Sequence, residues 1–335
     1  MPRFRQVTRL LYPELGVSDT SASDNSTTPT NTIAQRPTRL DLRSSGPLLP
    51  LPAPNPDGVI LLNQPGPYAA AEVTAVGVLQ IRGERHLHPE IVIRDRPLKL
   101  WADTVRLDNV RLQYEPAARS ENASPPPTAI VLIHAHSLVV EHCTFVSPCA
   151  VLDGNAARDS TASPTTFKTS ANETAATAGV AEGPTQLAWK LLDPPDPRGG
   201  QGVISHSVFL GDAPALYLAS PVRSLQQRHC LKIGQGPWCT LGTVPAAGKV
   251  LHWTWSNLTC RDSGAVLRWV VTNTPARPGR LQLDTRDCVF DPQPSGASLL
   301  EFVSTQEPAQ WSDLIRWQGD GSLVRPVENW VVWRD

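Results

Sequence analysis

Apolar and polar residues alternate with a period of two in recurring runs of four to seven residues beyond about residue 57. Such runs are typical of half-buried β-strands, and no helical periodicity interrupts them. One pattern recurs six times: a polar residue, then a polar residue that is usually His, Asn or Asp, then a small or apolar residue, any residue, and an apolar residue. The third positions of the six copies are Val110, Cys143, Ser207, Cys230, Leu258 and Cys288. Alternation predicts that the third and fifth positions share one face of a strand.

The spacing of the copies indicates a coil of strands. Ser207 and Cys230 are 23 residues apart, which fits a single turn of a solenoid. Cys143 and Ser207 are 64 residues apart, which we interpret as one turn plus a large insertion. Because residues 156–184 are rich in Ser, Thr and Ala, we expect a long mobile loop at about residues 154–186.

A second strand is predicted after most copies, beyond a short turn. Each of these strands begins with a small residue and continues with apolar ones, as in Ala129–Ile133, Ala150–Asp153, Ala215–Leu218, Ala265–Trp269 and Ser298–Phe302. The predicted repeat unit is therefore strand, tight turn, strand and variable loop, and the predicted fold class is all-β.

This repeat resembles the right-handed parallel β-helix, or pectin-lyase-like, family over roughly residues 57–335. The stretch Pro65-Gly66-Pro67-Tyr68 is similar to the sequence that leads into the first turn of such proteins. The resemblance implies a right-handed parallel β-helix (solenoid) of about seven or more turns. It implies no single function, since this fold hosts lyases, hydrolases, adhesins and inert spikes.

The two ends of the chain differ from the repeat region. Residues 1–56 are of low complexity, so we expect a largely disordered segment that ends in a Pro-rich linker. Met1–Gly16 lacks the apolar core of a signal peptide, which predicts a cytoplasmic chain unless it is part of a longer exported protein. Residues 329–335 look like an apolar strand, and we expect that something covers it or that the chain continues.

Composition excludes several classes of protein. The 33 Pro and 22 Gly among 335 residues argue against a helical fold. Lys and Arg total 30 against 31 Asp and Glu, so no global positive field attracts nucleic acid. No apolar run is long enough to span a bilayer, and no P-loop or dinucleotide fingerprint is present.

The cysteines and histidines follow the repeat, which favours structural roles. Cys143, Cys230 and Cys288 share one repeat position, and we expect them to be buried as small apolar side chains. No CxxC motif occurs, so we expect neither a metal site nor a cofactor. The histidines His142, His206 and His229 also recur with the coil, and we interpret them as turn residues that bond to neighbouring backbone.

A candidate active face lies on the second strand of the unit. Its fourth position carries Leu132, Asp153, Leu218, Arg268 and Glu301. The resemblance implies that acids in such a row can hold Ca²⁺ while an Arg acts as base, so Asp153, Arg268 and Glu301 are the candidate catalytic residues. The row is sparse, and no paired-Asp motif accompanies it.

Ten tryptophans against four tyrosines suggest a sugar-binding role for some of the indoles. Trp253 and Trp255 share a strand face, and an exposed pair could stack on sugar rings. Burial of both would remove this hypothesis.

Three functions follow from these patterns. The first is a non-catalytic β-helix module within a larger bacterial polypeptide, which binds a polysaccharide or another protein. The alternative is a carbohydrate-active enzyme, a polysaccharide lyase or glycoside hydrolase. The third is a purely structural spike or spacer.

Overall fold

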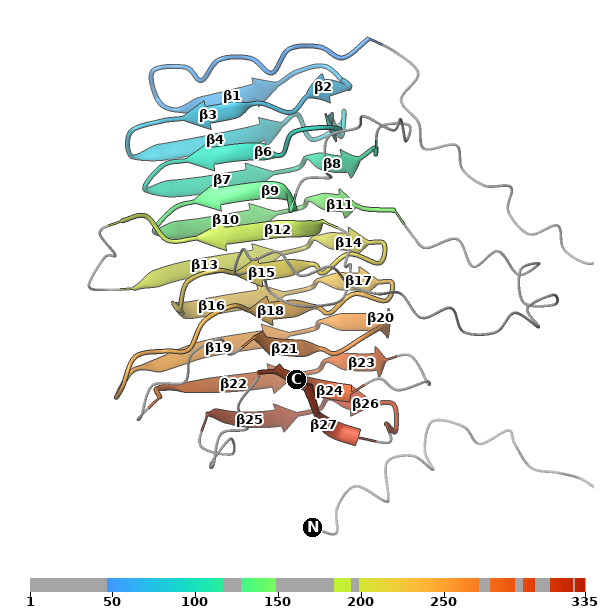
Figure 1. The fold of residues 1–335 in the computed structure, drawn as a ribbon. Coiled ribbons are helices and arrows are strands. Elements are labelled where there is room, and N and C mark those ends of the chain that lie inside the picture. The colour runs from blue at the N-terminus through green and yellow to red at the C-terminus, as the bar shows by residue number, and fades with distance from the viewer. Residues whose placement is uncertain are drawn as a thin grey trace, which may run out of the picture. The chain divides into compact units, whose positions relative to one another are not determined.

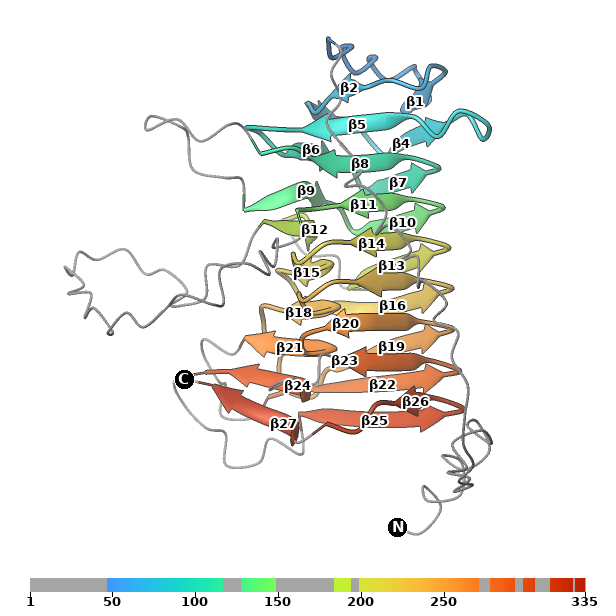
Figure 2. The same cartoon turned by 90° about the vertical axis from the view of Figure 1, so that its right-hand side faces the viewer.

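The structure is a computed structural model that describes residues 47–116, 128–148, 184–193, 199–270, 278–292, 298–304, 314–327 and 329–334. All regular elements in these ranges are β-strands, and no helix occurs there. The strands form three parallel sheets of nine strands each (Figures 1 and 2). The predicted all-β fold and parallel β-helix are therefore confirmed.

The three sheets are named I, II and III in the order in which the chain enters them. Sheet I contains β1 (Val59–Leu62), β4 (Val78–Gly83), β7 (Thr104–Asp108), β10 (Ser137–Glu141), β13 (Gly200–Ser205), β16 (Val222–Arg228), β19 (Val250–Ser256), β22 (Arg280–Arg286) and β25 (Ile315–Asp320). Sheet II contains β2 (Tyr68–Ala69), β5 (Glu90–Ile93), β8 (Arg111–Tyr114), β11 (Thr144–Val146), β14 (Val208–Leu210), β17 (Leu231–Ile233), β20 (Thr259–Ser263), β23 (Val289–Pro292) and β26 (Leu323–Val324). Sheet III contains β3 (Glu72–Thr74), β6 (Leu98–Trp101), β9 (Ala129–His134), β12 (Thr185–Lys190), β15 (Leu216–Leu218), β18 (Cys239–Leu241), β21 (Leu267–Val270), β24 (Ser298–Val303) and β27 (Asn329–Arg334).

Each coil of the chain contributes one strand to each sheet, which gives nine coils. Strands of neighbouring coils pair in parallel, so that Val139 of β10 lies between Arg106 and Val203. The sequence pattern predicted two strands per unit, and this is wrong. The recurring motif is the end of a sheet I strand, a corner, and the start of a sheet II strand.

The corner between sheets I and II takes one residue in a left-handed conformation. The second position of the motif has φ between 49° and 54° in six consecutive coils, at Asn109, His142, His206, His229, Asn257 and Asp287. Asn, Asp and His tolerate this region better than other residues with a Cβ. The chain turns there, and both the third and the fifth motif positions therefore point inward, as predicted.

Stacked side chains fill the interior. Phe145 and Phe209 lie with ring centroids 4.6 Å apart and planes 1° apart. Outside the core, the imidazole of His206 lies between those of His142 and His229, at centroid distances of 5.1 and 4.8 Å. Similar residues therefore form ladders along the stack, because consecutive coils keep the same register.

The large insertion predicted between Cys143 and Ser207 is confirmed by their contact. The backbone N–H of Cys143 donates to Ser207 Oγ at 3.2 Å across 64 residues of sequence. Strand β12 lies within this interval and includes the last two residues of the predicted loop. The rest of that loop and the predicted strand at 150–153 lie outside the described residues.

The sequence predicted that the ordered region starts near Asp57. The described fold begins before this residue. Leu49 pairs in parallel with Tyr68, and Leu49 and Leu51 pack against the core. Figure 1 shows this segment running across the end of the first coil. The expectations for residues 1–46 fall outside the described residues.

The cysteine ladder is confirmed. Cys143, Cys230, Cys239, Cys260 and Cys288 are all buried and free of disulfides. Burial raises the pKa of Cys143 to about 12 and that of Cys230 to about 11. These thiols are therefore protonated and poorly nucleophilic at neutral pH. In the part of the chain described, no helix is long and apolar enough to cross a membrane.

The left-handed backbone conformation of His206 predicts which substitutions this position tolerates. We expect His206→Val to lower the free energy of unfolding by about 1–2 kcal/mol, because a β-branched residue is strained at positive φ. His206→Asn keeps a residue type that suits this conformation and should change stability little. Urea unfolding of both variants tests this, and equal losses would contradict the corner assignment.

The imidazole ladder predicts acid sensitivity. Burial, together with His229, His142 and Arg228, lowers the pKa of His206 from its usual 6.5. The unfolded chain then binds this proton more readily, so the contribution of His206 is intact above about pH 6.5 and is lost as the pH falls through the lowered pKa. We expect the drop in melting temperature between pH 7.5 and 5.5 to be smaller in His206→Asn than in the original protein. Equal drops would show that the ladder does not carry the effect.

Candidate functional site

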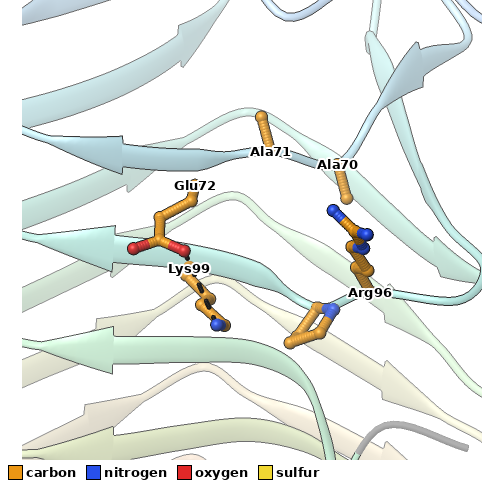
Figure 3. A pocket seen from close by; sticks show the side chains of 6 residues that line it. Ala70, Ala71, Glu72, Arg96 and Lys99 are labelled. Carbon is orange, nitrogen blue, oxygen red and sulfur yellow. Dashed lines mark ion pairs between the residues drawn. The ribbon is translucent and has the colours of Figure 1, made fainter.

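A hollow of about 380 Å³ lies on the outer face of sheet III, near the first coils of the stack (Figure 3). Its lining residues are Ala70, Ala71, Glu72, Arg96, Pro97 and Lys99. They come from strands β3 and β6 and from the corners that precede them. The volume lies within the range of sites for small molecules, so the hollow can hold a ligand about the size of one sugar ring.

Small residues at one corner leave the space open. Ala70 and Ala71 form the connection from β2 to β3, and their methyl groups cannot fill the surface between the two coils. The neighbouring coil supplies Arg96 and Pro97 at the same corner. Figure 3 shows Arg96 beside Ala70 on one side of the hollow, and the Glu72–Lys99 pair on the other side.

Glu72 and Lys99 form a weak ion pair at the edge of the hollow. The two residues are register neighbours, and Lys99 Nζ lies 3.5 Å from Glu72 Oε2. Their side chains are 39% and 60% exposed for Lys99 and Glu72, so water screens the pair. Such pairs contribute about 0–1 kcal/mol, so a ligand can exchange with either partner at little cost.

Arg96 is the second cation of the hollow. It is exposed, and within the described part of the chain its guanidinium has no hydrogen bond or ion pair. Figure 3 shows it directed toward Ala70, across the opening. Its N–H groups can donate to hydroxyl, carbonyl or acidic oxygens of a ligand.

An aromatic surface lies beside the hollow. Trp101 projects from the same face of β6 as Lys99, and its indole stacks on His134 of β9 at 3.6 Å with planes 4° apart. The register neighbour on the other side is Thr74, whose side chain is short. The indole face toward Thr74 is therefore not covered by another ring.

His134 is uncharged at neutral pH. Its partial burial, followed by the ammonium groups of Lys190 and Lys99, lowers its pKa. The stack is thus a neutral ring pair with charges of both signs near it, Lys99 and Lys190 as well as Glu72 and Asp193, which suits a polar ligand with an apolar ring face.

Arg268 and Glu301, two of the predicted catalytic residues, are brought together. They are register neighbours on the outer face of sheet III, and Arg268 Nε lies 2.6 Å from Glu301 Oε2. Arg334 binds the other carboxylate oxygen. Glu301 is only 3% exposed, so its carboxylate is enclosed by two guanidinium groups and has no open side for a substrate.

The predicted row is partly wrong. Its members Leu132, Arg268 and Glu301 do occupy one outward row, but Tyr217 fills the position assigned to Leu218. Leu218 is fully buried and points inward, because the strand there is displaced by one residue from the alignment assumed. Asp153 lies outside the described residues.

The proposed Trp253 and Trp255 binding patch is wrong. Both side chains have no exposed surface, and Trp253 Nε1 donates to the carbonyl of Val222 at 3.0 Å. The two residues share a face of β19 as expected, but this face points into the core. Buried indoles cannot stack on a ligand.

One pair of carboxylates was missed by the sequence analysis. Asp108 and Glu141 are register neighbours on the outer face of sheet I. His142 Nδ1 lies 3.4 Å from Asp108 Oδ1, and Ser205 Oγ donates to Glu141 Oε1 at 3.3 Å. The two acids are 33 residues apart in sequence and meet only because one coil stacks on the next.

The residues around the hollow also come from different coils and meet only through stacking, so the sequence analysis did not predict this site. Arg96 and Lys99 belong to one coil, whereas Ala70 and Glu72 belong to another, and no local motif contains all four. A register alignment of β3 with β6 would have joined them. Among the described residues, no group of three or more His, Cys, Asp or Glu is arranged to hold a metal ion.

No protein-family model, curated protein or solved structure matches this chain.

Glu301 provides a test of whether its cluster is structural. We expect Glu301→Ala to lower the free energy of unfolding by about 3 kcal/mol, because it leaves the partly buried Arg268 without its carboxylate. Arg334 is 53% exposed, so Arg334→Ala should cost about 1 kcal/mol or less. Urea unfolding measures both, and a smaller loss in Glu301→Ala than in Arg334→Ala would contradict this role.

Proposed function

We propose that the chain is a non-catalytic β-helix module that binds a polysaccharide on the outer face of sheet III. The observation that carries the proposal is the open hollow beside the Trp101–His134 ring stack. One sugar unit of a polysaccharide can place its CH face on the indole, while a neighbouring unit of the same chain places its hydroxyl groups against Arg96, Lys99 and Glu72.

The charge pattern supports a polar ligand over a protein surface. The hollow combines two cations and one anion with two alanines, and its neighbours are polar or aromatic. Protein interfaces are instead centred on a larger patch of buried apolar groups. A protein partner is therefore the second candidate ligand, and binding experiments distinguish it from a polysaccharide.

The enzyme alternative has one observation in its favour, the paired carboxylates Asp108 and Glu141. Glycoside hydrolysis uses two such groups, one on each side of the scissile bond. These acids lie on sheet I and not at the hollow, so cleavage and binding are separable activities.

Affinity electrophoresis and calorimetry on a panel of neutral and acidic polysaccharides test the proposal. We expect Trp101→Ala and Arg96→Ala each to weaken binding about tenfold, which corresponds to the loss of about 1.4 kcal/mol. Trp101→Phe keeps an aromatic face and should retain most of the affinity.

Arg106→Ala is the matched control, because Arg106 is an equally exposed arginine on sheet I. Unchanged binding in both Trp101→Ala and Arg96→Ala would remove the hollow as the site. Binding to no polysaccharide by a folded sample would overturn the proposal. New reducing ends that disappear in Glu141→Gln would establish the hydrolase alternative.

A further inference from the structure

Three histidines form a continuous row on the outside of the corner between sheets I and II. The connections from β10 to β11, from β13 to β14 and from β16 to β17 follow one another along one edge of the stack (Figure 2). They carry His142, His206 and His229, and all three residues are exposed. These three side chains make up the imidazole ladder.

The imidazole ladder offers ring edges to a ligand. The ring of His206 lies 5.1 Å from that of His142 and 4.8 Å from that of His229, with the ring planes 16° and 22° apart. The facing sides of the rings are covered by stacking, so a ligand contacts the edges with their N–H groups. The row therefore suits recognition of charge, and it has no room between the rings for a nucleobase or a sugar ring.

The net charge of this corner depends on pH. Asp108 Oδ1 lies 3.4 Å from His142 Nδ1, while Glu141 and Arg228 interact electrostatically with His206. With uncharged rings, two carboxylates outnumber one guanidinium. Histidine side chains gain a proton between pH 8 and 5. Three protonated rings would therefore reverse the sign of the surface from negative to positive.

The other neighbours of the ladder do not alter this balance. On the side of sheet II, the first residues of β11, β14 and β17 are uncharged: Thr144, Val208 and Leu231. Asn109 and Asn257 hold the corner positions immediately before and after the ladder. Arg111, the register neighbour of Thr144, pairs with Glu90 at 3.3 Å. The three rings thus form a separate group that can become positively charged.

His206 links protonation to the binding of an anion. Loss of solvent contact lowers its pKa, and His229, His142 and Arg228 lower it further, because neighbouring cations oppose one another. An anion lying across all three rings would counteract this repulsion. Protonation and anion binding therefore favour each other.

A run of linked phosphate groups fits the row better than a single anion does. A single phosphate can reach only part of the ladder, and an exposed ion pair in water is weak. When phosphates are linked, the first contact holds the next groups close to the remaining rings, which strengthens the whole complex.

We propose that the imidazole ladder is an acid-activated binding site for linked phosphate groups, such as those of an inorganic polyphosphate. The protonated rings of His142, His206 and His229 donate hydrogen bonds to phosphate oxygens, and Arg228 supplies a permanent cation beside them. The site lies at the corner between sheets I and II, so it does not rest on the proposed polysaccharide site on sheet III.

Calorimetry with inorganic tripolyphosphate at pH 7.5 and 5.5 tests the proposal on the full chain. We expect affinity to be at least about tenfold higher at pH 5.5. The ligand itself loses negative charge on acidification, so a gain in affinity must come from the protein. Orthophosphate, which cannot span the ladder, should bind at least about tenfold more weakly.

Asparagine variants locate the site, because Asn already occupies the same corner in the neighbouring coils. His206→Asn should weaken binding at pH 5.5 about fivefold. Replacement of all three ladder histidines by Asn should abolish the gain in affinity at pH 5.5. His252→Asn is the matched control, since His252 is an exposed histidine on the outer face of sheet I, and it should bind like the original chain.

Long-range proton–nitrogen spectra of the imidazole rings follow protonation directly. Tripolyphosphate should raise the pKa of His206 and leave that of His252 unchanged. A purely structural ladder would show no such shift. Melting curves establish that each variant is folded at both pH values.

Absence of binding at pH 5.5 by folded protein overturns the proposal. Acid-dependent binding that persists in the triple Asn variant places the site elsewhere and also overturns it. Orthophosphate binding as tight as that of tripolyphosphate would exclude recognition of linked groups. An equal loss in His252→Asn and His206→Asn would show that the overall charge of the protein causes the binding.

Discussion

In all three sheets, the peptide groups of each coil bond to those of the coils before and after it. This bonding fixes the register, so a residue's position within its coil decides whether its side chain joins the core or the surface. In six consecutive coils, one left-handed residue turns the chain from sheet I to sheet II without interrupting the register. The imidazole ladder, the buried thiols and the Arg268–Glu301 pair all result from the same alignment.

The sequence was sufficient to predict the strands, the stacking and the inward motif positions, because these depend on alternation and spacing. It did not show that the motif bends, since His142 or His206 has the same polarity in a corner as in a strand. Lys232 illustrates a second limit. It occupies an inward position between Phe209 and Cys260, where the pattern predicts an apolar residue. It is fully buried, and its ammonium donates to the carbonyl of Gly211.

The candidate site was less predictable than the fold. Glu301 and Arg268 were recognised as polar residues of one row, but their ion pair and the second guanidinium on Glu301, from Arg334 of the last strand, depend on the stacking of coils. Trp253 and Trp255 were correctly paired, yet alternation alone does not say which face of a strand is inside. Arg96, Lys99 and Trp101 lie within six residues of each other, but the small residues that leave space beside them belong to the preceding coil.

The register also limits what the stack can do as a spacer. One coil from Ser207 to Cys230 takes 23 residues and adds about 4.8 Å along the stack, the distance between neighbouring strands. The same 23 residues fully extended would reach about 75 Å. The stack is therefore poorly suited to spanning long distances with few residues. Each added coil instead extends three rigid outer faces by one row of side chains. Duplication or loss of a coil would lengthen or shorten the surface offered to a polymer while leaving the remaining rows in place.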